Sequence, residues 1–202
     1  MKKLIVGVIG ALVVLAAGVG LWIALDSVKA AATVGSVKIS ASKVDASVKQ
    51  ILADRKTVST TGMTLATGVN LTTEQLNNEV IAILLADTAA AHNVTVTDAQ
   101  VTAREAKYLA QAGSAAKLKT EEVSGDIATT DFASLVRRFM YVEALTSLVE
   151  KQGSSVSNAG TAVVALVHAQ ALKEGVTINP KYGTWNSAQV SVTPPTATAT
   201  TK

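Results

Sequence analysis

The chain has 202 residues, enough for one domain with a buried core, and 49% of them are hydrophobic although only 3% are aromatic. Its formal net charge is +3, and it falls to +1 without residues 1–30, which carry three of the 18 basic and one of the 15 acidic residues. This balance, with no clustered basic face, argues against nucleic acid as a partner. The absence of cysteine excludes disulfides, thiolate metal sites and a lipid-modified cysteine after a leader.

The first segment, residues 1–30, has the composition of a signal peptide or a membrane anchor. Two lysines follow Met1, and the 22 residues Leu4–Leu25 carry no charge. A signal peptide has an apolar core of about 7–15 residues, whereas a spanning helix needs about 20. The length favours a retained anchor and the small residues after Lys29 suit cleavage, so both interpretations stay open. In either case the N-terminal lysines favour the cytoplasmic side, and the rest of the chain is expected to be exported.

The next residues predict a short β element and a helix. Residues Thr33–Ile39 alternate loosely between polar and apolar, with Gly35 and Ser36 placed for a turn, which is typical of a short strand or a small hairpin. Ser40 or Ser42 can cap a helix that continues to about Thr57. The following stretch, 59–70, is rich in Ser, Thr and Gly and reads as a loop.

A pair of helices is expected in Leu71–Gln111, around which the rest of the chain is organised. Thr72 can cap the first helix, with Gln75 three residues later completing a capping box. The break at residues 92–96 contains His, Asn and β-branched residues. Thr97 and Gln100 repeat the capping pattern for the second helix, and Gly113 is placed to end it.

The C-terminal half predicts two more helices and a strand. Residues 113–130 read as a linker whose mixed charges form a solvated face. A strongly apolar helix follows over Asp131–Gln152, and a short Ser-rich linker joins it to a helix over Ala159–Glu174. Val176–Ile178 reads as a short strand, and we expect it to pair with the strand at Val34–Ile39. Residues 191–202 are Thr- and Pro-rich and are expected to form a disordered tail.

Several phrases along the chain resemble one family of exported chaperones. They are "VGSVKISASKVDASV" near residue 40, "A-x-x-x-V-x-V-T-D-A-x-V" around Val94, "LVRRFMYVEAL" in the apolar helix, and "VTINPKYGTWN" after the last helix. Their order resembles the N-terminal domain of the SurA/PrsA group, which is related to the peptide-binding part of trigger factor. Asn186 departs from this pattern, because the family usually has Asp there. The resemblance covers roughly residues 33–190.

This resemblance implies a mainly α fold with a small antiparallel β element that joins its ends. The expected organisation is a signal peptide or anchor over 1–30, a SurA-like helical domain over 31–190 and a tail over 191–202. In SurA and PrsA a parvulin prolyl isomerase module lies between the long helix and the last helix. Here only residues 153–158 lie between them. The resemblance therefore implies the chaperone domain alone, without the isomerase.

Motifs for catalysis and for cofactors are absent from the sequence. It has no phosphate-binding or dinucleotide-binding glycine pattern and no G-x-S-x-G elbow. His92 and His168 have no His, Cys or carboxylate at ligand spacing. We therefore expect no enzyme activity, no cofactor and no metal.

Arg137 and Arg138 interrupt the apolar helix. They could meet an acidic partner or a membrane surface, or they could face solvent while their stems cover apolar neighbours.

The best candidates for a binding surface are four apolar residues of the Asp131–Gln152 helix: Phe132, Val136, Phe139 and Met140. An open helical scaffold can leave an apolar groove uncovered for an extended polypeptide. The same residues could simply form the core, since apolar residues at helical spacing usually do.

The expected function is non-catalytic binding of unfolded or exported polypeptides outside the cytoplasm, near the membrane or in secreted form. The alternative is a structural or adaptor protein of the cell envelope that docks one folded partner.

Overall fold

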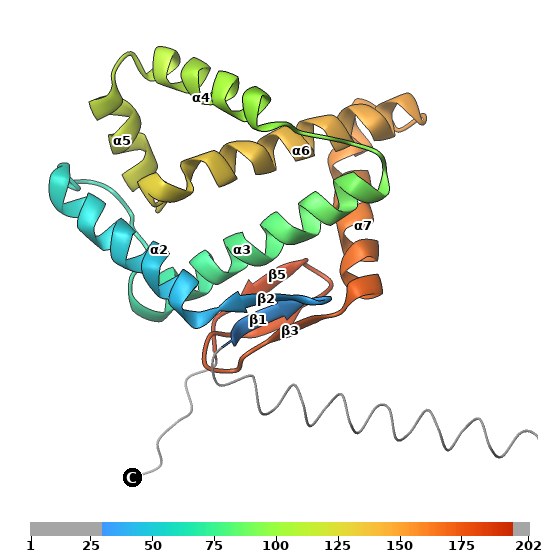
Figure 1. The fold of residues 1–202 in the computed structure, drawn as a ribbon, viewed down its shortest axis with the longest axis horizontal. Helices are drawn as coiled ribbons and strands as arrows, with labels where there is room; N and C mark the ends of the chain where they lie inside the picture. Colours follow the sequence, from blue (N-terminus) through green and yellow to red (C-terminus); the bar gives the residue numbers. More distant parts are fainter. Residues whose placement is uncertain (1–29, 196–202) are drawn as a thin grey trace, which may run out of the picture.

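The structure, a computed structural model, describes residues 30–195 of the 202 (Figure 1). The six α-helices of this part are α2 (Ala41–Asp54), α3 (Gly68–Ala91), α4 (Asp98–Ala112), α5 (Ala115–Ser124), α6 (Phe132–Lys151) and α7 (Val156–Glu174). Its strands are β1 (Ala30–Val34), β2 (Val37–Ser40), β3 (Val176–Ile178), β4 (Thr184–Asn186) and β5 (Ser191–Thr193), and 3-10 turns span Arg55–Thr57 and Thr129–Asp131. The expected mainly α fold with small antiparallel sheets is thus confirmed.

The predicted membrane or signal segment, Leu4–Leu25, lies outside the described residues. Within residues 30–195, no helix combines the length and the apolar character that crossing a bilayer requires.

The first sheet joins the two ends of the helical body. β1 pairs antiparallel with β2 through the turn at Gly35, and antiparallel with β3 on its other edge, where Ala32 lies opposite Ile178 and Val34 opposite Val176. The predicted pairing is correct only in part: Val176–Ile178 pairs with β1, so Val34 alone of the predicted segment Val34–Ile39 takes part, and residues 37–39 belong to β2. β1 begins at Ala30, three residues before the expected start, because Ala31 and Ala32 face the core.

The second sheet corrects the expected boundary of the tail. Residues 191–193 form β5, which pairs antiparallel with β4 and therefore belongs to the fold. The Val192 side chain is 7% exposed, and its N–H donates to Asn77 Oδ1 of α3 at 2.9 Å. Gly183 precedes this hairpin with φ 146°, and a Cβ there would lie 2.3 Å from the Thr193 carbonyl oxygen. The prediction missed the strand because one buried valine among threonines and prolines leaves almost no pattern.

α3 is the central helix. It lies between the sheets and α6 and contacts both, as well as α2 and α7 (Figure 1). Its side chains Leu76, Val80 and Leu84 are fully buried and form the middle of the main core, as their spacing predicts.

The helix ends agree with the sequence at some positions and not at others. Thr97 and Gln100 form the predicted capping box of α4, and Gly113 ends that helix with φ 80°. The predicted box at Thr72 is wrong, because α3 already begins at Gly68. Gln75 of that pair instead donates from Nε2 to the carbonyl oxygen of Asp126 at 3.1 Å.

The linker predicted over 113–130 contains α5. Ser114 caps this helix by accepting a hydrogen bond from the Lys117 N–H at 3.2 Å. The charges of the segment are not all solvated, since Glu122 is 5% exposed and Lys119 lies 3.3 Å from Asp54 Oδ1. The mixed charge of this segment predicts a solvated linker, but half of the carboxylates and lysines of the helix face the protein.

A buried polar network fastens the end of α5 to α2. The Arg55 guanidinium lies 2.5 Å from Asp126 Oδ1 and also donates to the carbonyl oxygen of Ala66 at 2.7 Å. The second oxygen of Asp126, Oδ2, accepts the Ala66 N–H at 2.7 Å. The residue before Arg55, Asp54 at the end of α2, accepts the backbone N–H and the hydroxyl of Thr129 at 3.2 and 3.0 Å. Burial acts to raise the pKa of Asp54, but the hydrogen bonds from Thr129, Lys119 and Gln50 together hold it below its usual value.

We predict that Asp126→Asn lowers the free energy of unfolding by about 2–3 kcal/mol, because it removes one partner of a buried ion pair. Asparagine tolerates the positive φ of 53° at this position, so the backbone is not strained. Denaturant unfolding measures the effect. The exposed Asp45→Asn serves as the control and should stay within about 0.5 kcal/mol of the wild type. Equal stability of the two variants would contradict the role given to the network.

We also predict that Val192→Ala lowers the free energy of unfolding by about 1–2 kcal/mol, because it removes buried apolar atoms from β5. Val164→Ala, on the exposed side of α7, is the matched control, since that valine is 53% exposed. If both changes are neutral in thermal unfolding, residues 191–193 behave as the tail that the sequence predicts.

Candidate functional site

The four predicted binding residues all lie on α6, but they differ in exposure. Phe139 is 48% exposed, Phe132 and Met140 are half-buried, and Val136 is buried at 1%. Phe132, Val136 and Phe139 line one groove. Met140 does not line it and packs instead in an apolar cluster between α4 and α6 that includes Val136.

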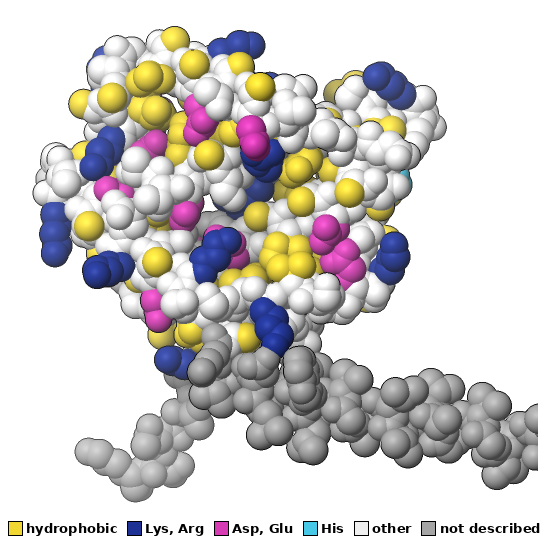
Figure 2. Space-filling view, in the orientation of Figure 1, with side chains coloured by type: hydrophobic (Ala, Val, Ile, Leu, Met, Phe, Trp, Pro, Cys, Tyr) yellow, Lys and Arg dark blue, Asp and Glu magenta, His cyan; other side chains and the backbone are white. Residues whose placement is uncertain are grey.

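We call this feature the α5–α6 groove. Its volume is about 160 Å³, and it opens between α4, α5 and the first half of α6. It is lined by Tyr108, Leu118, Glu121, Glu122, Ile127, Phe132, Val136 and Phe139. Figure 2 shows hydrophobic side chains gathered in this region, at the upper left. Tyr108 and Phe132 meet edge to face, with ring centroids 6.1 Å apart, and fix one wall.

Sequence reasoning missed the half of the groove that comes from outside α6. Leu118, Glu121 and Glu122 lie at positions i, i+3 and i+4 of α5, so they share one helix face. That spacing was the available signal, but it is only visible once the segment is read as a helix. Tyr108 and Ile127 carry no sequence signal that assigns them to this site.

α4 is attached to α6 by charged hydrogen bonds. Arg104 donates from both terminal nitrogens to Glu143, at 2.8 Å each, and the hydrogen bonds from Arg104 hold the pKa of the Glu143 carboxyl below its usual value. Arg137 donates to the carbonyl oxygen of Val96 at 2.9 Å and to the Asp98 carboxylate at 2.5 Å. These contacts keep α4 beside α6 and so hold the groove open on that side.

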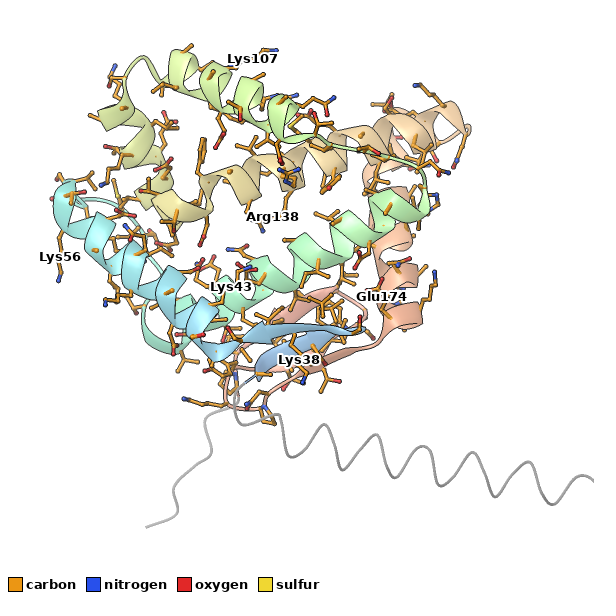
Figure 3. All side chains as sticks on the ribbon, viewed as in Figure 1. Lys38, Lys43, Lys56, Lys107, Arg138 and Glu174 are labelled. Atoms are coloured by element: carbon orange, nitrogen blue, oxygen red, sulfur yellow. The ribbon has the colours of Figure 1, made fainter. Side chains whose placement is uncertain are left out.

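The arginine pair therefore does not simply face solvent. Arg137 binds the start of α4, and Arg138 points toward α3, where Nη1 donates to Asn78 Oδ1 at 2.9 Å (Figure 3). The Arg138 Nε atom is buried without a hydrogen-bond partner. Burial lowers the pKa of Arg138, with Glu79 and Asp131 acting in the opposite direction. Of the two alternatives considered for this pair, the solvent-facing one does not describe it, because both side chains bind α4 or α3.

The two acidic residues of the groove have different surroundings. Glu121 is exposed at its edge, whereas Glu122 is 5% exposed and lies against α2. Burial raises the pKa of Glu122, a hydrogen bond from Thr129 acts to lower it, and the nearby Asp54 charge acts to raise it. Burial is the larger effect, so ionisation of Glu122 in the groove costs free energy.

The lining offers apolar contact, one phenol and two carboxylates. Neither serine, histidine nor lysine contributes to it. Within residues 30–195, no group of three or more His, Asp or Glu side chains is arranged to hold a metal ion. The chemistry of the groove suits noncovalent binding of apolar side chains.

Comparison with known proteins finds no matching family model, no matching curated protein and no matching solved structure.

We predict that Glu122→Gln raises the free energy of unfolding at pH 7. Because folding raises the pKa of Glu122, protonation of its carboxyl stabilises the folded protein. This stabilisation is fully present below the usual pKa of 4.5, and it is lost as the pH rises through the raised value. The difference between variant and wild type should thus shrink as the pH falls toward 4.5. Denaturant unfolding at both pH values measures it. Glu121→Gln, at an exposed position, is the control and should change little. Destabilisation by Glu122→Gln at pH 7 would contradict the assignment.

Proposed function

We propose that this protein is a non-catalytic, extracytoplasmic chaperone-like protein that binds unfolded or exported polypeptides in the α5–α6 groove. The observation that carries the proposal is Phe139, an aromatic side chain that remains 48% exposed at the edge of an apolar groove. Burying a fully exposed apolar side chain of this size is worth about 1.5–3 kcal/mol, so covering the exposed half of Phe139 is worth roughly half of that. Such a residue is therefore a natural first contact for an apolar client segment.

The dimensions of the groove favour side chains over a small molecule. Ligand pockets usually enclose about 300–1,000 Å³, whereas this groove has about 160 Å³. That space suits one or two side chains of a longer chain that runs across the surface. Contact of this kind is weak at each site and tolerant of sequence, as binding of many unfolded clients requires.

The sequence resemblance to the SurA/PrsA group supports the same proposal. α6 and α7 are joined by the four residues 152–155, which leaves no room there for the isomerase module. The apolar stretch Leu4–Leu25 supports export of the folded part. An envelope adaptor would use the same groove for one folded partner, and the range of clients separates the two functions.

We predict that Phe139→Gln weakens binding of unfolded chains about tenfold, because it removes the exposed aromatic contact. The protein lacking only residues 1–25 is mixed with a chemically denatured model protein, and light scattering is followed on dilution. The wild type should suppress aggregation, and Phe139→Gln should require a correspondingly higher concentration for the same effect.

Leu172→Gln is the matched control, since Leu172 is 65% exposed on α7 and does not line the groove. It should suppress aggregation as the wild type does. Equal loss in both variants, or no suppression by the wild type at severalfold molar excess, would contradict the proposal. The latter result, followed by recovery of one folded partner through crosslinking, would favour the adaptor.

A further inference from the structure

A second and larger cavity lies at the opposite end of the fold from α4. It has a volume of about 450 Å³ and lies between α2, the start of α3 and the segment after β3. It is lined by Asp45, Val48, Leu52, Thr67, Gly68, Val69, Leu71, Thr72, Thr73, Lys181 and Tyr182. Leu52 and Val69 remain 46% and 54% exposed at its edge. The chaperone proposal uses none of these residues.

This cavity lies beside the point where the chain enters the fold. Asn179 donates from Nδ2 to the carbonyl oxygen of Ala30 at 3.1 Å, and from its backbone N–H to that of Ala31 at 2.9 Å. The same asparagine accepts the Lys181 N–H at Oδ1, at 3.1 Å, and the Tyr182 N–H at its carbonyl oxygen, at 2.8 Å. Ala30 and the cavity wall are thus held together by one residue.

The length of chain before Ala30 limits its distance from a membrane. The apolar stretch ends at Leu25, and the five steps to Ala30 span at most about 18 Å. If Leu4–Leu25 occupies a bilayer, the corner of the fold around Ala30 lies within that distance of the lipid headgroups. The cavity extends from Lys181 and Tyr182, which follow Asn179, along α2 as far as Leu52.

The charge of this corner suits anionic lipid. Lys181 lies at the cavity, with Nζ 5.5 Å from the ring centre of Tyr182, and Lys49 is one turn from Asp45 and from Leu52 on α2. Both lysines are exposed, and the ion pairs found within residues 30–195 involve neither. Lys38, which is also exposed, lies at the lower edge of the domain in Figure 3, whereas Lys107 lies at the upper edge. Asp45 is the one acidic residue that lines the cavity.

We propose that this corner rests on an anionic lipid surface, with Leu52 and Val69 against acyl chains and Lys49 and Lys181 against phosphate headgroups. Each lysine close to such a surface adds attraction that falls off within a Debye length of about 8 Å. The corner would therefore orient the domain, with the α5–α6 groove facing away from the membrane. This inference does not depend on the chaperone function.

The absence of native cysteine makes a direct test possible. The full chain carrying Val69→Cys or Val156→Cys is labelled with an environment-sensitive fluorophore and reconstituted into vesicles that contain lipid-attached quenchers. Val156 is 83% exposed at the start of α7, whose 19 residues place it about 28 Å from the sheet. In vesicles with phosphatidylglycerol, quenching at position 69 should clearly exceed that at position 156.

Charge reversal separates lipid contact from simple tethering. Lys49→Glu with Lys181→Glu should reduce quenching at position 69 to the level at position 156, while Lys107→Glu with Lys117→Glu on the far side should leave it unchanged. Equal quenching at positions 69 and 156, or the same quenching at position 69 in purely zwitterionic vesicles, would overturn the proposal. So would protection of position 69 that depends on protein concentration, since a second copy would then cover this face.

Discussion

The buried ion pair between Arg55 and Asp126 is the constraint on which the candidate site depends. It connects the end of α2 with the turn between α5 and α6, and both partners also bind the backbone of Ala66, so three separate segments meet at two side chains. A buried charge that loses its partner is strongly destabilising, so these segments hold their positions together. Asp54, with its hydrogen bonds to Thr129, adds a second fixed point beside the first.

The α5–α6 groove follows from this arrangement. α5 is held at its C-terminal end by the polar network, while α4 is held against α6 by Arg104 and Arg137. The two helices are thus fixed by separate contacts, and the space between them is not filled by a core side chain. Phe139 remains exposed because no described element covers its side of α6. The same chain therefore has a close-packed core around α3 and an unfilled apolar surface beyond α6, a division that suits a binding protein with a rigid base.

Much of the framework could be predicted from the sequence. Periodic apolar residues predicted α3 and α6, and the capping pair Thr97 and Gln100 predicted the start of α4. Short β-branched segments predicted that Val176–Ile178 pairs near Val34, although the strand that pairs is β1 and not the predicted Val34–Ile39. The missed elements, α5, β4 and β5, are short and weakly patterned, and α5 and β5 are stabilised by distant partners such as Asp54 and Asn77. For the same reason, only the α6 half of the site could be predicted from the sequence. The α6 residues lie on a clear apolar helix, but sequence spacing alone cannot distinguish exposed Phe139 from buried Val136, because that difference depends on where α4 and α5 pack.

The central claim is that unfolded polypeptides contact the groove at Phe139. Site-specific photo-crosslinking tests it most directly, with a photoreactive phenylalanine analogue at position 139 and, in a second protein, at position 172 on the exposed side of α7. The account predicts adducts with many different newly exported chains from position 139, competed by an added unfolded protein, and few from position 172. The same pattern of adducts from both positions, or no adducts from position 139, would contradict it.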